Sequence, residues 1–181
     1  MRYDRRMPSK YVLTSLVFGT LIGLMWIGEV VVGNLGDTKV LGSIRTVHPK
    51  LYRDTAGCCV LGVLILTGSA GFFGAHQTGE IRTGVQVGFW SGLISGAITL
   101  AALMIVTFVF LDALMSAPSN IAEFAGQPRG SSLGFARWLY LDALAGGLNH
   151  LWIGPMLGLV IGGAGAILGK SCSSNVSARP R

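Results

Sequence analysis

Four long intervals without a charged residue constrain the fold of this sequence more than any other feature. They contain 18, 25, 29 and 27 residues and lie between Lys10 and Glu29, Asp54 and Glu80, Arg82 and Asp112, and Asp142 and Lys170. A helix needs about 20 mostly apolar residues to cross the hydrocarbon core of a bilayer. Each interval is therefore long enough, or nearly long enough, to form a transmembrane helix.

The composition agrees with burial in lipid. Of the 181 residues, 51% are hydrophobic and 12% are charged, whereas an ordinary soluble domain has roughly 25% charged residues. Strands of a membrane barrel alternate between polar and apolar residues and are only about ten residues long, which does not fit continuous apolar runs. We predict an all-α integral membrane protein with four transmembrane helices, at about 11–33, 55–77, 84–111 and 143–169.

The charged residues also predict the domain organisation and the topology. Residues 1–10 form a basic N-terminus, residues 11–169 one transmembrane domain, and residues 170–181 a short basic tail. With both termini in the cytoplasm, eight Lys and Arg residues lie inside and six outside, and the basic cluster before the first helix usually dominates orientation. We expect a bacterial plasma (inner) membrane protein with both termini cytoplasmic. The N-terminal segment is interpreted as an uncleaved signal anchor, with a cleavable secretory signal as the alternative.

A tight link at residues 77–81 and two longer loops predict two helical hairpins. The second loop ends in the sequence SSLGFARWLYLDALAGG, which carries Trp138 and Tyr140. This stretch is either a short interfacial helix or a direct extension of the fourth span. The segments LGVLILTGSAG at 61–71 and LGLVIGGAG at 157–165 resemble each other, through an internal repeat or through shared composition.

Small residues recur at helical spacing in the predicted spans. The glycines in this pattern are Gly84, Gly88, Gly92 and Gly96 in the third span, Gly154, Gly158 and Gly162 in the fourth, and Gly19 and Gly23 in the first. Residues four apart share one face of a helix, and small residues there let helices approach closely within lipid. We predict that these faces are glycine zippers, which pack helices within one chain or between chains.

Four ionisable residues lie within or near the spans and form a candidate polar site. Glu29 lies 19 residues from Lys10 and His150 lies 20 residues from Lys170, so the two are expected at a similar depth. Asp112 and Asp142 are expected at the same outer end. In the functional interpretation, Glu29 and His150 pair and relay a proton or bind a cation. In the alternative, the carboxylates only mark span ends and His150 hydrogen-bonds a neighbouring helix.

Known chemical motifs are missing from the sequence. It has no phosphate-binding loop, dinucleotide fingerprint, nucleophile elbow or metal-ligand spacing, so we expect no cofactor and no metal. The net charge of +6 is spread over the segments that flank the spans, unlike the concentrated patch of a nucleic-acid-binding protein. The expected partners are the lipid bilayer and either further copies of the chain or another membrane protein.

Three functions remain, in a definite order. The first is a non-catalytic membrane subunit, assembly factor or scaffold, which fits the glycine faces and the lack of chemical motifs. The second is a small oligomeric channel or transporter, with a path along Ser91, Ser95 and Thr99 or through the polar site near the outer face. An intramembrane enzyme ranks third, because Asp112, Asp142 and His150 match no catalytic pattern.

Overall fold

Every regular element of the described part of this computed structural model, residues 9–127 and 134–177, is helical. Its four long helices are α1 (Ser9–Leu35), α3 (Pro49–Thr78), α4 (Ile81–Val109) and α7 (Phe135–Ser177). All four are long and apolar enough to cross a membrane. The predicted class, an all-helical integral membrane protein, is confirmed to that extent. The basic N-terminal residues 1–8 and the last four residues of the basic tail lie outside the described residues.

α1 and α7 extend beyond their apolar intervals at both ends, whereas α3 and α4 do so only at their N-terminal ends. α3 begins at Pro49, a residue whose fixed φ suits the first turn of a helix. It ends before Gly79, whose φ of 71° and N–H bond to the Ala75 carbonyl, at 2.7 Å, form a left-handed cap. α7 begins at Phe135, so the segment with Trp138 is an extension of the fourth span rather than a separate interfacial helix.

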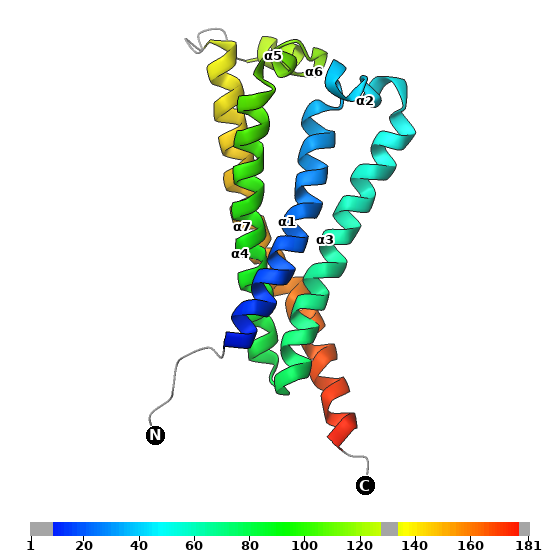
Figure 1. Cartoon of the computed structure of the whole chain (residues 1–181), viewed down its shortest axis with the longest axis vertical. Coiled ribbons are helices and arrows are strands. Elements are labelled where there is room, and N and C mark those ends of the chain that lie inside the picture. Colours follow the sequence, from blue (N-terminus) through cyan, green and yellow to red (C-terminus); the bar gives the residue numbers. More distant parts are fainter. Residues whose placement is uncertain (1–8, 128–133, 178–181) are drawn as a thin grey trace.

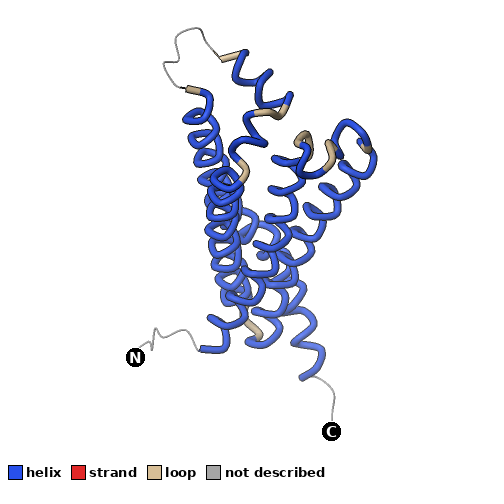
Figure 2. Tube along the Cα trace, turned by 45° about the horizontal axis from the view of Figure 1, so that its top comes forward, coloured by secondary structure: helices blue, strands red, loops and turns tan. Residues whose placement is uncertain are grey.

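The connections between long helices lie at two opposite ends of the bundle. α1 begins, α3 turns into α4, and α7 ends at the lower end in Figure 1. The upper end carries the short helices η1 (Lys39–Leu41), α2 (Ile44–Val47), α5 (Leu111–Met115) and α6 (Pro118–Ala125). Figure 2 shows the same end brought forward, with short loops between these helices. The longer connections therefore form a partly helical cap over one end only.

α4 occupies the middle of the bundle. It packs against α1, α3 and α7, most extensively against α7. Large apolar side chains point outward from the bundle; among the most exposed are Leu13, Phe108, Trp152 and Val160. In water such a surface would aggregate, whereas in a bilayer it contacts lipid.

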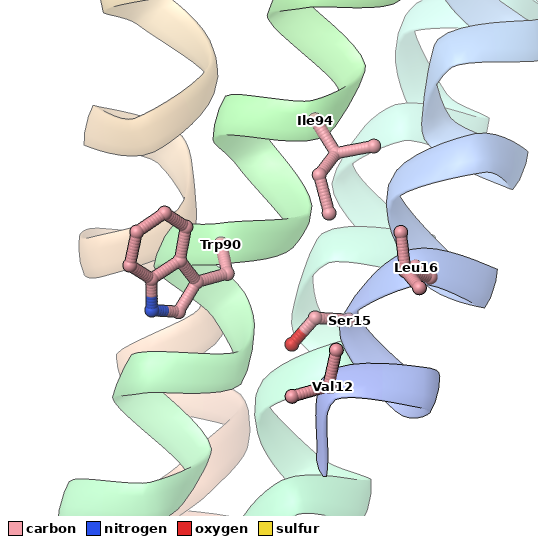
Figure 3. A pocket seen from close by; sticks show the side chains of 5 residues that line it. All are labelled: Val12, Ser15, Leu16, Trp90 and Ile94. Carbon is pink, nitrogen blue, oxygen red and sulfur yellow. The ribbon is translucent and has the colours of Figure 1, made fainter. Parts of the chain in front are cut away.

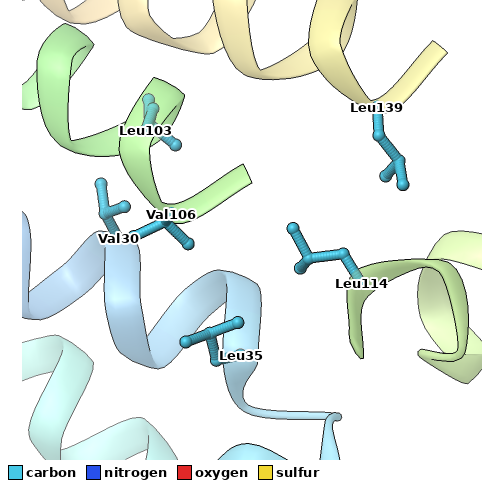
Figure 4. Close-up of a cluster of buried hydrophobic side chains, with 6 residues drawn as sticks. All are labelled: Val30, Leu35, Leu103, Val106, Leu114 and Leu139. Carbon is cyan, nitrogen blue, oxygen red and sulfur yellow. The ribbon is translucent and has the colours of Figure 1, made fainter. Parts of the chain in front are cut away.

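Two groups of contacts tie the upper end together. One is an apolar cluster that joins α1, α4, α5 and α7 (Figure 4), made of Val30, Leu35, Leu103, Val106, Leu114 and Leu139. The other is an ion pair in which Arg45 Nη1 lies 3.1 Å from Asp37 Oδ2. The Arg45 guanidinium also lies 5.1 Å from the centre of the Tyr52 ring. The α1–α3 connection is therefore packed onto the helices and not a free loop.

Candidate functional site

The most extensive helix contact is between α4 and α7, whose backbones touch along a row of glycines. A Cβ atom built at Gly92 would collide with the Gly154 carbonyl, and one at Gly88 would lie 2.5 Å from the Gly158 oxygen. At Gly96 it would lie 2.7 Å from the His150 oxygen. We call these five glycines, Gly88, Gly92, Gly96, Gly154 and Gly158, the α4–α7 glycine contact. Only residues without a side chain fit at its centre.

Gly84 and Gly162 lie where three helices meet. A Cβ at Gly84 would collide with the Gly71 carbonyl of α3 and lie 2.6 Å from the Ala166 Cβ of α7. A Cβ at Gly162 would lie 3.1 Å from the Gly88 Cα of α4. This junction of α3, α4 and α7 is filled by small residues from all three helices.

Gly19 and Gly23 of α1 meet mainly side chains, although a Cβ at Gly19 would also lie 3.0 Å from the Ser91 carbonyl oxygen. Gly19 faces Ile94 and Gly23 faces Ile98, and an added Cβ would lie 2.7 Å from the Ile94 Cβ and 2.9 Å from the Ile98 Cδ1. Both isoleucines belong to α4. The two glycines thus form a groove in α1 that accepts a ridge of α4, as in ordinary helix packing.

A second glycine row on α7 was missed in the sequence. A Cβ at Gly165 would collide with the Gly68 carbonyl of α3, and one at Gly169 with the Phe72 carbonyl. Gly162, Gly165 and Gly169 are spaced by three and then four residues, which also keeps them on one helix face. The strict four-residue spacing of the first row concealed this mixed pattern.

The hydroxyl groups of α4 are buried and bonded. Ser91, Ser95 and Thr99 are 0% exposed. Ser95 donates to the Gly92 carbonyl at 2.8 Å and Thr99 to the Ser95 carbonyl at 2.9 Å, both within α4. Ser91 donates to the Ser15 carbonyl of α1 at 3.3 Å. Side chains with no surface accessible to water cannot line an open path through a single chain.

The structure places His150 against an aromatic ring. Its Nδ1 lies 2.8 Å from the Gly146 oxygen, and because a carbonyl only accepts, Nδ1 carries the proton and donates. The imidazole meets the Trp26 ring edge-on, with ring centres 4.7 Å apart. The hydrogen bond is therefore made within α7, and the contact with the neighbouring α1 is aromatic.

Glu29 and His150 are not joined by an ion pair or hydrogen bond in the part of the chain that the structure describes. Glu29 is half-buried on α1, with its Oε1 3.5 Å from where a Cβ at Gly33 would lie. Asp112 on α5 and Asp142 on α7 are both exposed. Within residues 9–127 and 134–177, no three His, Cys, Asp or Glu side chains are grouped as metal ligands would be.

Comparisons with protein-family models, with curated proteins and with solved structures find no match to this chain. A helical membrane bundle by itself assigns no activity, because one fold hosts many functions. The function of this chain therefore has to be inferred from its own side chains and surfaces.

Proposed function

We propose that this chain is a non-catalytic component of a membrane complex: a subunit, assembly factor or scaffold that acts through helix packing. The observation that carries the proposal is the filling of the bundle interior by close backbone contacts, centred on the α4–α7 glycine contact. The hydroxyl groups beside it are already bonded to carbonyls. What the chain offers to other molecules is therefore its apolar outer surface.

The proposed architecture is two helical hairpins, α1 with α3 and α4 with α7, packed through glycine zippers. The extensive packing of α4 against α7 supports the second hairpin. The first hairpin rests on the short connection from α1 to α3, because α1 packs more extensively against α4 than against α3. Packing of small residues is the main force between helices in lipid, because apolar surfaces gain nothing by leaving lipid for each other. We place the protein in the bacterial plasma membrane with both termini in the cytoplasm, on the basis of the basic residues before α1.

The partner of the proposed subunit is another membrane protein, whereas further copies of this chain are the partner in the channel or transporter alternative. Exposed apolar side chains on all four long helices, among them Leu13, Leu61, Phe108 and Trp152, provide the surface for either. A channel or transporter could not use a path along Ser91, Ser95 and Thr99 within one chain, because these residues are buried. Its path would lie in the Glu29 and His150 region or between copies.

Affinity purification from native membranes in mild detergent tests the proposal, with the mass of the intact complex measured and co-purifying proteins identified. A stoichiometric partner of a different sequence is the expected result. A homo-oligomer without a partner would contradict it and favour the channel or transporter, with flux through reconstituted Glu29→Gln and His150→Ala variants as the next measurement.

A matched pair of variants ties the result to helix packing. Gly92→Leu places a large side chain in the α4–α7 glycine contact and is expected to abolish co-purification. Gly57→Leu adds the same side chain at a position with nothing within 4 Å, and should retain the partner unless Gly57 itself lies in the interface. Retention of the partner by Gly92→Leu would refute the role of packing.

A further inference from the structure

A pocket of about 240 Å³ lies between α1 and α4, close to the end at which α1 begins. It is lined by Val12, Ser15 and Leu16 of α1 and by Trp90 and Ile94 of α4 (Figure 3). We call it the α1–α4 pocket. It is smaller than the roughly 300–1,000 Å³ of typical small-molecule sites, so it suits a section of hydrocarbon chain better than a compact polar metabolite.

The inner wall of the pocket has no hydroxyl group free to bind a polar ligand. Its only hydroxyl, that of Ser15, already donates to the Tyr11 carbonyl at 3.0 Å. Val12 and Leu16 are about half exposed, at 48% and 47%, so the pocket opens to the outside of the bundle. In a membrane that outside is lipid.

Trp90 contributes the one polar atom at the rim that has no partner. No hydrogen bond joins its indole N–H to any of the described residues. Figure 3 shows the indole nitrogen turned away from Ile94 and toward the level of Val12, which is the direction of the start of α4. Tryptophan rings with this arrangement bury their apolar part and direct the N–H to the polar edge of the membrane.

A positive charge lies farther along in the same direction. Arg82 is exposed and precedes Trp90 by eight residues of α4, or about 12 Å at helical rise. Its guanidinium is therefore closer to the membrane surface than the indole. Guanidinium groups bind phosphate oxygens with two parallel hydrogen bonds.

We propose that the α1–α4 pocket binds one anionic phospholipid. An acyl chain lies between Leu16 and Trp90, an ester or phosphate oxygen accepts a hydrogen bond from the Trp90 indole, and the headgroup lies beside Arg82. A hydrocarbon chain gains little by moving from bulk lipid into an apolar pocket. The indole therefore adds affinity for a phospholipid, and the guanidinium supplies the preference for an anionic headgroup. This site is independent of whether the chain is a subunit or a channel.

Native mass spectrometry of the purified full chain tests the site. The delipidated protein in detergent is titrated with phosphatidylglycerol and, separately, with phosphatidylcholine, and the fraction carrying one bound lipid is measured. We expect one phosphatidylglycerol to bind at a lower concentration than phosphatidylcholine. Equal binding of the two lipids would overturn the assignment of an anionic ligand.

Variants locate the lipid on the protein. Trp90→Phe keeps an aromatic ring but removes the donor, and should weaken phosphatidylglycerol binding about fivefold, the usual effect of losing one hydrogen bond. Leu16→Trp fills the pocket from a half-exposed position and should remove the tight site. Arg82→Gln should reduce the preference for phosphatidylglycerol over phosphatidylcholine.

The control is Trp152→Phe, which changes a lipid-facing tryptophan on α7 that does not line the pocket and is 71% exposed. It should bind as the wild type does. Wild-type affinity in both Leu16→Trp and Trp90→Phe would overturn the proposal, because the bound lipid would then lie elsewhere. So would a dimer that Leu16→Trp dissociates without changing lipid binding, since a second copy would then fill the pocket.

Discussion

At Gly92 the fold leaves no room for a single methyl group. The added carbon would meet the Gly154 carbonyl, its carbon atom and the Pro155 nitrogen, all of them backbone atoms that cannot rotate aside. Gly92→Ala is therefore expected to lower the free energy of unfolding by about 1–3 kcal/mol, the usual cost of overpacking. Unfolding of the detergent-solubilised protein, followed by circular dichroism, measures this.

Gly57→Ala is the matched control for that substitution. Gly57 also lies within a long helix, but a Cβ there has nothing within 4 Å. Alanine should leave stability unchanged or raise it by up to about 1 kcal/mol, because glycine is the more flexible residue in the unfolded chain. If the two variants unfold alike, the close contact at Gly92 is not what holds α4 and α7 together.

The two members of the Asp37–Arg45 ion pair are unequally buried, so removing the charge of one should affect stability differently from removing both charges. The Asp37 side chain is only 9% exposed and the Arg45 side chain 44%. Arg45→Ala leaves a buried carboxylate without its cation, and should cost about 1–3 kcal/mol of unfolding free energy. Adding Asp37→Asn should recover part of the loss, because a neutral amide is cheaper to bury unpaired.

Arg53→Ala provides the baseline for the Arg45 measurement, since Arg53 is exposed on α3. It should change the free energy of unfolding by less than about 0.5 kcal/mol. A loss in Arg45→Ala no larger than this baseline would mean that Asp37 is satisfied without Arg45.

At the residue scale, the sequence predicts which residues share a helix face but not which helix that face contacts. Periodicity groups Gly88 with Gly92 on one side of α4, yet nothing in a four-residue repeat says which helix that side meets. Gly19 and Gly23 have the same spacing, and the structure sets them against isoleucine side chains. His150 and Glu29 illustrate the same limit, because a matching depth along two helices does not fix the directions in which their side chains point.

At the scale of one helix, α4 associates with its neighbours in two ways, by close packing at glycines and by hydrogen bonds from hydroxyl groups. Its hydroxyls at Ser95 and Thr99 bond within α4, and only that of Ser91 reaches another helix. Ser91→Ala should therefore cost about 0.6 kcal/mol, the mean for an interhelical hydrogen bond in a membrane. This is less than the expected cost of Gly92→Ala, and the same unfolding assay ranks the two. A larger loss in Ser91→Ala would make hydrogen bonding the stronger force.

Helix ends are less predictable from apolar intervals than helix existence. An interval without charges reports only the part of a helix that lies in lipid. α3 carries Lys50, Arg53 and Asp54 in its first turns, and α7 runs for 43 residues, or about 64 Å. Such a length exceeds a hydrocarbon core of about 30 Å, so the ends of α7 extend beyond the core. Caps such as Pro49 and Gly79, rather than hydropathy, set where α3 begins and ends.

For the whole molecule, four crossings predict which ends can be labelled from each side. Cys172 is exposed near the end of α7, and Glu123 is exposed on α6 at the opposite end of the bundle. In a background without other cysteines, a membrane-impermeant maleimide should label Glu123→Cys in intact cells. Native Cys172 should be labelled only after the cells are permeabilised.

The two labelling results together test the orientation of the protein and the number of its membrane crossings independently. Reversed labelling would place both termini outside and contradict the expected orientation. Labelling of both positions from the same side would contradict four crossings. The Glu123→Ser protein with all cysteines replaced supplies the unlabelled background.

The repeated glycines along α4 and α7 also raise a problem of registration, as two combs with equally spaced teeth can mesh in more than one position. A slide of one turn, about 5.4 Å, would again set glycine against glycine at the centre. Gly147 breaks the ambiguity, because Leu100 lies directly against it and a Cβ there would come within 3.0 Å of the Leu100 Cα. A slide in one direction brings Ala143 to that place and in the other Leu151. A single glycine outside the repeat, Gly147, therefore fixes the register of α7 against α4.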